Sequence, residues 1–278
     1  MAELRDAQFG DADKVEQQQY LDRLSGILRR FDVTIAEASD LVILSDYEIA
    51  IIVDDSTSMK SSADPVSQRV LGQKPRTRWD EVKATASLLI EIANCFDSSG
   101  VDVFFLNRRA ALGVKSERDA TIVKAFADPP NGPTPLSDCL EQVAARMVGE
   151  RPVLLFILTD GEPDGGRQTV IGSIRKLLKS DACKRQLRIQ IMACTPDESE
   201  IAWMNEVDHE FSEVDVTDDY HAEKLEVEQA GRAKRFTRGD WCMKALLGMV
   251  SSKFDGWDEK RRITNLAKCN PLDTCVVL

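Results

Sequence analysis

Signals for secretion and for crossing a membrane are missing from this sequence. It has no apolar signal region near Met1 and no apolar run long enough to span a bilayer. Its seven cysteines are an odd number and show neither CxxC nor Cys–His spacing, a usage that is typical of a reducing compartment. We therefore expect a cytoplasmic protein.

The short motifs of several enzyme classes are missing as well. The sequence contains no GxxxxGKS or GxxxxGKT phosphate loop, no set of kinase motifs and no HExxH zinc motif. Histidine is scarce, with only His209 and His221 in the whole chain, so a Ser-His-Asp site is not expected. These absences favour a binding protein over an enzyme.

Positive charge is in deficit. The 36 Lys and Arg residues against 47 Asp and Glu give a formal net charge of −11. Such a chain repels polyanions, so we expect no nucleic-acid partner. An apolar fraction of 43% is enough to bury a sizeable core, and 278 residues suit one large domain with extensions.

Short apolar runs alternate with helical patterns over residues 45–256. The expected strands are 47–53, 101–106, 153–159, 187–194 and 211–216. The expected helices are 79–96, 116–127, 136–148, 170–179, 198–207 and 241–254. This alternation predicts an α/β fold: a doubly wound, mostly parallel sheet with helices on both faces. Ligands of such sheets bind at the carboxyl ends of the strands.

The remaining segments are extensions and insertions. Residues 1–14 are expected to be a flexible polar tail. Residues 15–44 are expected to be a helical extension, whose apolar stripe either packs on the protein's own core or docks a partner helix. That stripe consists of Leu21, Leu24, Leu28, Phe31, Ile35 and Val42. Residues 217–240 form a highly charged insertion, expected to be a loop or a short helix.

Oxygen-bearing side chains follow two of the expected strands. The first strand runs into Asp54-Asp55-Ser56-Thr57-Ser58, and the central strand runs into Asp160. Thr134 lies between them in sequence, in a turn-rich loop before a helix. All three groups are expected at one sheet edge, where their oxygens could converge on a Mg²⁺ ion, which prefers six oxygen ligands. Because hydroxyl ligands are neutral, the ion would keep enough charge to attract an external anion.

The Asp54-x-Ser56-x-Ser58 motif, Thr134 and Asp160-Gly161 resemble the metal-ion-dependent adhesion site of von Willebrand factor A domains. The resemblance covers roughly residues 45–255 and agrees in the order of strands and helices. It implies a six-stranded sheet with one short antiparallel edge strand, here at Ala111–Val114.

The resemblance also implies a ligand set. Ser56, Ser58 and Thr134 would contact Mg²⁺ or Mn²⁺, and Asp54 and Asp160 would bind it directly or through water. The sixth position would accept the Asp or Glu carboxylate of a partner protein. The middle of the first motif is often glycine in the family and is Thr57 here. The expected function is metal-dependent protein binding.

A basic loop at residues 60–78 leaves directly from this motif. It carries five cations against one acid, Asp64, and these cations are Lys60, Arg69, Lys74, Arg76 and Arg78. They would form a positive lip that favours acidic partners and speeds their approach. The alternative is a solvated insertion without a binding role.

Residues 257–278 are expected to be a C-terminal tail ending in Cys275-Val276-Val277-Leu278. This ending resembles a CaaX box, in which the cysteine is prenylated and a final Leu favours geranylgeranyl. One lipid chain needs a second signal for firm attachment, which palmitoylation of Cys269 or nearby basic residues would supply. We expect peripheral attachment to the cytosolic face of a membrane; the alternative is an apolar end tucked into the core.

Two other functions compete with metal-dependent binding. One is a Mg²⁺-dependent phosphohydrolase, because a magnesium ion beside a parallel sheet also suits phosphoryl chemistry. The other is a scaffold that assembles through residues 15–44 and needs no metal.

Overall fold

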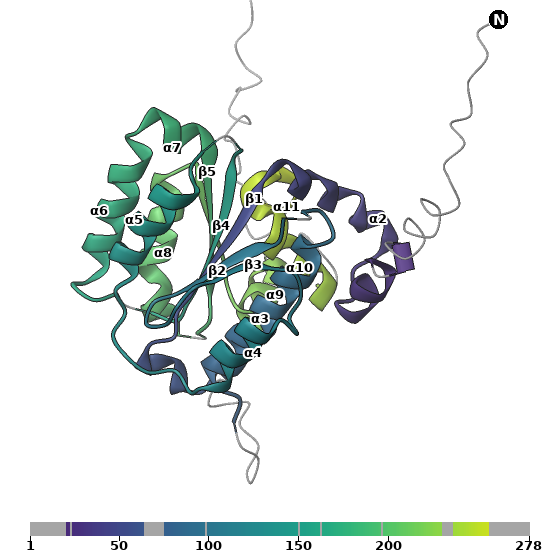
Figure 1. The fold of residues 1–278 in the computed structure, drawn as a ribbon, viewed down its shortest axis with the longest axis horizontal. Coiled ribbons are helices and arrows are strands. Elements are labelled where there is room, and N and C mark those ends of the chain that lie inside the picture. The colour runs from purple at the N-terminus through teal and green to yellow at the C-terminus, as the bar shows by residue number, and fades with distance from the viewer. Residues whose placement is uncertain are drawn as a thin grey trace, which may run out of the picture.

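The computed structural model describes residues 21–22, 24–63, 75–97, 99–149, 151–161, 163–195, 197–229 and 236–255. These residues form an α/β fold in which helices flank a six-stranded mixed sheet (Figure 1). The predictions for residues 1–14 and 257–278 lie outside the described residues, and so do the lipidation sites predicted at Cys269 and Cys275. No helix in the described part of the chain is long and apolar enough to cross a membrane.

The sheet has the strand order β3-β2-β1-β4-β5-β6. Its strands are β1 Glu48–Val53, β2 Val101–Phe105, β3 Ala111–Val114, β4 Val153–Thr159, β5 Leu187–Ala193 and β6 Val214–Thr217. Four of the five strand pairs are parallel, and only β2 and β3 run antiparallel. The short antiparallel edge strand is therefore confirmed at the residues expected for it.

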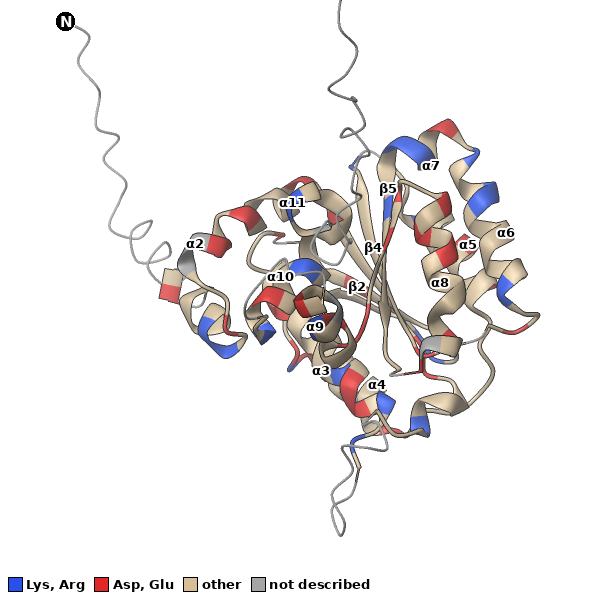
Figure 2. Ribbon diagram, turned by 180° about the vertical axis from the view of Figure 1, so that it is seen from behind, with Lys and Arg blue, Asp and Glu red and all other residues tan. Residues whose placement is uncertain are grey.

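Helices cover both faces of this sheet. They are α3 Arg78–Ala93, α4 Ala120–Ala127, α5 Leu136–Met147, α6 Arg167–Leu178, α7 Asp181–Gln186, α8 Glu198–Glu210, α9 Tyr220–Gln229 and α10 Arg238–Leu247. Helices α5, α6 and α8 lie on one face, and α3, α9 and α10 on the other (Figure 1). Every residue of β4 is buried, as expected for a central parallel strand between two helical layers. Acidic and basic residues are spread over the outer helices (Figure 2).

The strand order places a crevice between β1 and β4. The chain proceeds from β1 through β2 to β3 on one side of the sheet and from β4 through β5 to β6 on the other. The connections therefore leave β1 and β4 in opposite directions, and their carboxyl ends open a crevice that commonly binds ligands. Asp54 follows β1 and Asp160 follows β4, so both stand at this position.

The segment expected to be a helical extension, residues 15–44, is divided into separate helical pieces in its described part. Residues 24–30 are helical, and the chain then turns before α2 Ile35–Ala38 and the 3-10 helix η1 Asp40–Asp46. Asp32 adopts a φ of 58° at the turn, which ends the first helix. Thr34 then starts α2 through a capping box with Glu37.

This N-terminal extension packs on the protein's own core. Leu28, Leu41 and Leu44 are buried in the same apolar cluster as β1 and α3. Two members of the predicted stripe, Leu21 and Val42, are instead exposed. The packing alternative predicted for the stripe therefore applies to its central part.

The charged insertion contains the helix α9, in agreement with the short-helix alternative. The helix expected over 241–254 is instead divided into α10, a 3-10 turn at Gly248–Val250 and α11 Ser252–Asp255. A Cβ atom at Gly248 would lie 2.2 Å from Oδ2 of Asp215 in β6. A larger residue at this position would therefore have to displace the Asp215 carboxylate.

Candidate metal site

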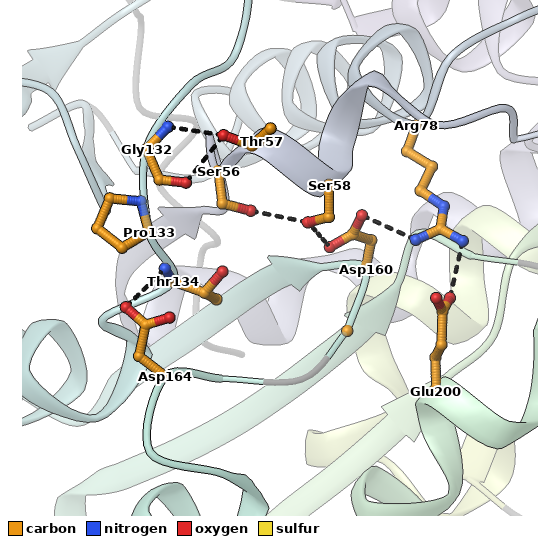
Figure 3. Close-up of a pocket in the computed structure, with 11 residues that line it drawn as sticks. Ser56, Thr57, Ser58, Arg78, Gly132, Pro133, Thr134, Asp160, Asp164 and Glu200 are labelled. Atoms are coloured by element: carbon orange, nitrogen blue, oxygen red, sulfur yellow. Dashed lines mark hydrogen bonds and ion pairs between the residues drawn. The ribbon is translucent and has the colours of Figure 1, made fainter.

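A cavity of about 360 Å³ opens at the carboxyl ends of β1 and β4 (Figure 3). It is lined by Ser56, Thr57, Ser58, Arg78, Gly132, Pro133, Thr134, Asp160, Gly161, Asp164 and Glu200. Four of the five predicted metal ligands are among these residues. The fifth, Asp54, lies behind them and is fully buried.

Three oxygen atoms form a line along one wall of the cavity. Ser56 Oγ lies 2.9 Å from Ser58 Oγ, and Ser58 Oγ donates a hydrogen bond of 2.9 Å to Asp160 Oδ1 (Figure 3). In an octahedral Mg²⁺ shell with Mg–O distances of about 2.0–2.1 Å, neighbouring ligand oxygens are about 2.9 Å apart. The hydrogen bonds thus hold these oxygens at a spacing that suits adjacent magnesium ligands.

Thr134 reaches the cavity from a loop that is fixed at both ends. Its N–H donates to Asp164 Oδ2 over 3.0 Å, and its carbonyl accepts from the N–H of Asp164 over 2.9 Å. Upstream, the N–H of Thr57 donates to the carbonyl of Gly132 over 3.0 Å, and Thr57 Oγ1 accepts from the N–H of Gly132 over 3.1 Å. Thr57, where the family often has glycine, therefore ties the two ligand-bearing loops together.

Asp54 supports the site from below the cavity wall. One of its carboxylate oxygens accepts from the N–H of Ser56 over 2.9 Å, and the other accepts from Thr159 Oγ1 over 2.7 Å. Burial, and after it the negative charge of Asp160, raises the pKa of Asp54 to about 6. A cation near both carboxylates would remove that repulsion, so the residues present fit a divalent metal ion.

Arg78 does not belong to an exposed lip, contrary to the sequence-based prediction. It is 8% exposed, and its Nη1 pairs with Asp160 Oδ2 at 2.9 Å while its Nη2 pairs with Glu200 Oε2 at 2.7 Å (Figure 3). The two carboxylate oxygens of Asp160 therefore have different partners: Oδ1 accepts a hydrogen bond from Ser58, and Oδ2 pairs with the guanidinium of Arg78. Arg78 is directed inward because it is the first residue of α3, which begins at the sheet edge.

The other predicted lip residues give a mixed result. Lys60 is exposed, and its Nζ donates to Asn131 Oδ1 at 3.4 Å. Arg76 pairs with the buried Glu81 at 3.0 Å. Arg69 and Lys74 lie outside the described residues. The lip as a whole stays a prediction.

Asp55, Asn107 and Arg108 form a support that the sequence analysis missed. Asp55 Oδ1 accepts from the N–H of Asn107 at 2.8 Å, and Asp55 Oδ2 pairs with Arg108 Nε at 3.0 Å. Asn107 Nδ2 and Arg108 Nη2 donate to the carbonyls of Pro133 and Pro129, at 2.9 and 2.6 Å. The end of β2 thus anchors the loop that carries Thr134. The sequence places Asn107 and Arg108 directly after an expected strand, but it does not indicate that they contact Asp55.

The proposed ligand set contains only two carboxylates, although Asp164 and Glu200 also line the cavity. Among the residues that the structure describes, no group of three or more His, Cys, Asp or Glu side chains is placed to hold a metal ion. The candidate site has two carboxylates, Asp54 and Asp160, and depends on three hydroxyls for the rest. Such a set suits a hard cation such as Mg²⁺ or Mn²⁺ and does not suit a soft metal.

Comparison with known proteins does not place this chain in a family. No protein-family model and no curated protein sequence matches it. Among solved structures, the PilB minor pilin from Streptococcus sanguinis has a TM-score of 0.45 at 12% identity, over 72% of this chain and 60% of the pilin. A point mutant of that pilin has a TM-score of 0.47 at 13% identity, over 76% of this chain and 62% of the mutant. The chain thus spans less than two thirds of either pilin, and a likeness this weak assigns no function.

Proposed function

We propose that Asp54, Ser56, Ser58, Thr134 and Asp160 hold a Mg²⁺ or Mn²⁺ ion, and that this ion binds an Asp or Glu carboxylate of a partner protein. The protein would then be a metal-dependent binding module with an adhesion site of the von Willebrand factor A type. The proposal rests chiefly on one observation, the line of oxygens from Ser56 through Ser58 to Asp160 at 2.9 Å spacing beside an open cavity.

The surroundings of this line favour capture of an external ligand. Ser58 is exposed, whereas Ser56 and Asp160 are buried, so an ion held by all three would have one side toward the cavity. Neutral hydroxyl ligands offset less of the ion's charge than carboxylates do. A divalent ion in this set would therefore retain an attraction for an anionic group at an open coordination position.

The N-terminal extension argues against the metal-independent scaffold. The helical extension buries Leu28, Leu41 and Leu44 against the protein's own core, which leaves less apolar surface for a metal-independent assembly.

Calorimetric titration with Mg²⁺ and Mn²⁺ tests the metal site. Wild type should bind one ion, and Ser58→Ala should bind it at least tenfold more weakly, about 1.4 kcal/mol, because one ligand oxygen is removed. Ser180→Ala is the matched control, since Ser180 is exposed and caps α7 without a side-chain hydrogen bond. Equal affinity in wild type and Ser58→Ala would remove the basis of the proposal.

A further inference from the structure

A second cavity, of about 270 Å³, is lined by residues adjacent in sequence to those that line the first one. It is lined by Lys60, Thr77, Trp79, Asp80, Lys83, Ala127, Pro129 and Pro130. Neither of its two lysines belongs to the candidate metal site. Its lining therefore combines two ammonium groups with the flat apolar rings of Trp79, Pro129 and Pro130.

Three segments contribute residues to both cavities. The 3-10 helix η2, Thr57–Lys60, offers Ser58 to the first cavity and Lys60 to the second. The start of α3 offers Arg78 to the first and Trp79 to the second, and the loop before α5 contributes prolines to both. A partner segment bound at the metal could therefore extend across η2 and place a second side chain in this cavity.

The second cavity carries an excess of positive charge. Among the described residues, neither Lys60 nor Lys83 has an ion-pair partner, and Lys83 Nζ lies 5.5 Å from the ring centroid of Trp79. Its one acid, Asp80, already accepts from the N–H and Oγ1 of Thr77, at 3.0 and 2.6 Å, as the capping box of α3. Two lysines thus face one engaged carboxylate, in a chain whose net charge is −11.

We infer that this cavity is a second subsite, which binds another acidic side chain from the partner segment whose first carboxylate is held by the metal. The inference rests on the proposed function. Lys60 and Lys83 would pair with the second carboxylate, and the exposed ring of Pro129 would contact the methylene groups of a glutamate. The partner segment then has two acidic residues a few positions apart. An extended chain advances about 3.3 Å per residue, so a separation of two to four residues spans roughly 7–13 Å.

A peptide series tests this subsite. Each peptide has a Gly/Ser/Ala background and one fixed Asp, either alone or with a Glu two, three or four residues later. Fluorescence anisotropy with full-length protein in Mg²⁺ should show that the best diacidic peptide binds at least tenfold more tightly than the monoacidic one. Lys83→Gln should remove most of this difference without changing the affinity for Mg²⁺ or for the monoacidic peptide. Lys179→Gln, at the exposed C-cap of α6, makes the same charge change outside both linings and should have no effect.

The outcomes separate this inference from the proposed function. If no peptide binds in Mg²⁺, or if all bind equally in EDTA, carboxylate capture by the metal is wrong and the subsite falls with it. If the peptides bind only in Mg²⁺ but the second acid adds nothing, or if Lys83→Gln retains the full difference, the subsite alone is wrong. Acetylation of lysines, followed by mass spectrometry, gives a second readout: the diacidic peptide should protect Lys60 and Lys83, and the monoacidic peptide should not.

Discussion

Replacing Arg78 by glutamine removes the cation that pairs with Asp160 at 2.9 Å. Removing one partner of a buried ion pair costs about 3–5 kcal/mol of folding free energy. The Asp160 side chain is 2% exposed, but that of Glu200 is 35% exposed, so water screens the second half of the pair. We therefore expect Arg78→Gln to lower the free energy of unfolding by about 3 kcal/mol in EDTA, at the low end of this range.

Mg²⁺ should reduce this loss. In the variant, the ion can compensate Asp160 in place of the guanidinium, and it no longer experiences the repulsion of a neighbouring positive charge. Urea unfolding of wild type and Arg78→Gln, in EDTA and in excess Mg²⁺, measures both effects. We expect the difference between the two proteins to shrink by at least about 1.4 kcal/mol in Mg²⁺, which corresponds by linkage to tenfold tighter binding of the ion by the variant.

The control is a second arginine, whose ion pair is far less buried than that of Arg78 with Asp160. Arg175 pairs with Glu210 at 2.6 Å, with side chains that are 44% and 35% exposed. Arg175→Gln should cost at most about 1 kcal/mol, equally with and without Mg²⁺. If the loss in Arg78→Gln is the same or larger in Mg²⁺ than in EDTA, Arg78 does not compete with a cation for Asp160, and the reasoning about the shared carboxylate is wrong.

Two other substitutions test the loops and the packing near the sheet. Thr57→Gly removes the hydroxyl that forms hydrogen bonds with Gly132. Calorimetry should then show weaker Mg²⁺ binding, and urea unfolding should show a free energy of unfolding lower by about 1 kcal/mol. An unchanged Mg²⁺ affinity would show that the site does not need these hydrogen bonds between the loops. Gly248→Ala brings a methyl group within 2.2 Å of a carboxylate oxygen and should destabilise by about 2 kcal/mol or more. Gly172→Ala, in α6 with nothing within 4 Å, should be neutral or stabilising, and equal effects of both would refute the packing argument.

The strands could be predicted closely because burial alone determines their pattern. Val153–Thr159 is an uninterrupted apolar run, and the structure places β4 at those residues. The antiparallel edge strand was expected only through the family resemblance, since four residues carry too little pattern to identify it alone. The last strand starts at Val214 instead of 211, because α8 extends to Glu210 and Phe211 caps it.

Helix starts were predicted less well, although their signal is local. Three helices begin at a Thr-x-x-Asp or Thr-x-x-Glu capping box, and these boxes start at Thr34, Thr77 and Thr237. Each such box satisfies two of the free N–H groups at a helix start. Use of this pattern would have divided the N-terminal extension and started α3 at Arg78, which would have brought this arginine to the sheet edge.

Other features depend on contacts between distant parts of the chain. Asp55 and Arg108 are an ion pair across the ends of β1 and β2, and neither residue predicts the other from its neighbours. The steric constraint at Gly248 requires knowledge of where β6 lies. In both cases the deciding neighbour is more than 30 residues away in sequence, so periodicity and turn chemistry contain no information about it.

The shared position of Asp160 reconciles two requirements on the candidate site. Two buried carboxylates, Asp54 and Asp160, repel each other and would destabilise a fold that had no cation near them. Arg78 supplies that cation from the protein itself, so the fold has a compensating charge before any metal arrives. Because the guanidinium pairs with Oδ2 of Asp160, Oδ1 stays beside Ser58, where the proposed ion would bind. Under the proposed function, metal binding would then control partner capture without controlling folding.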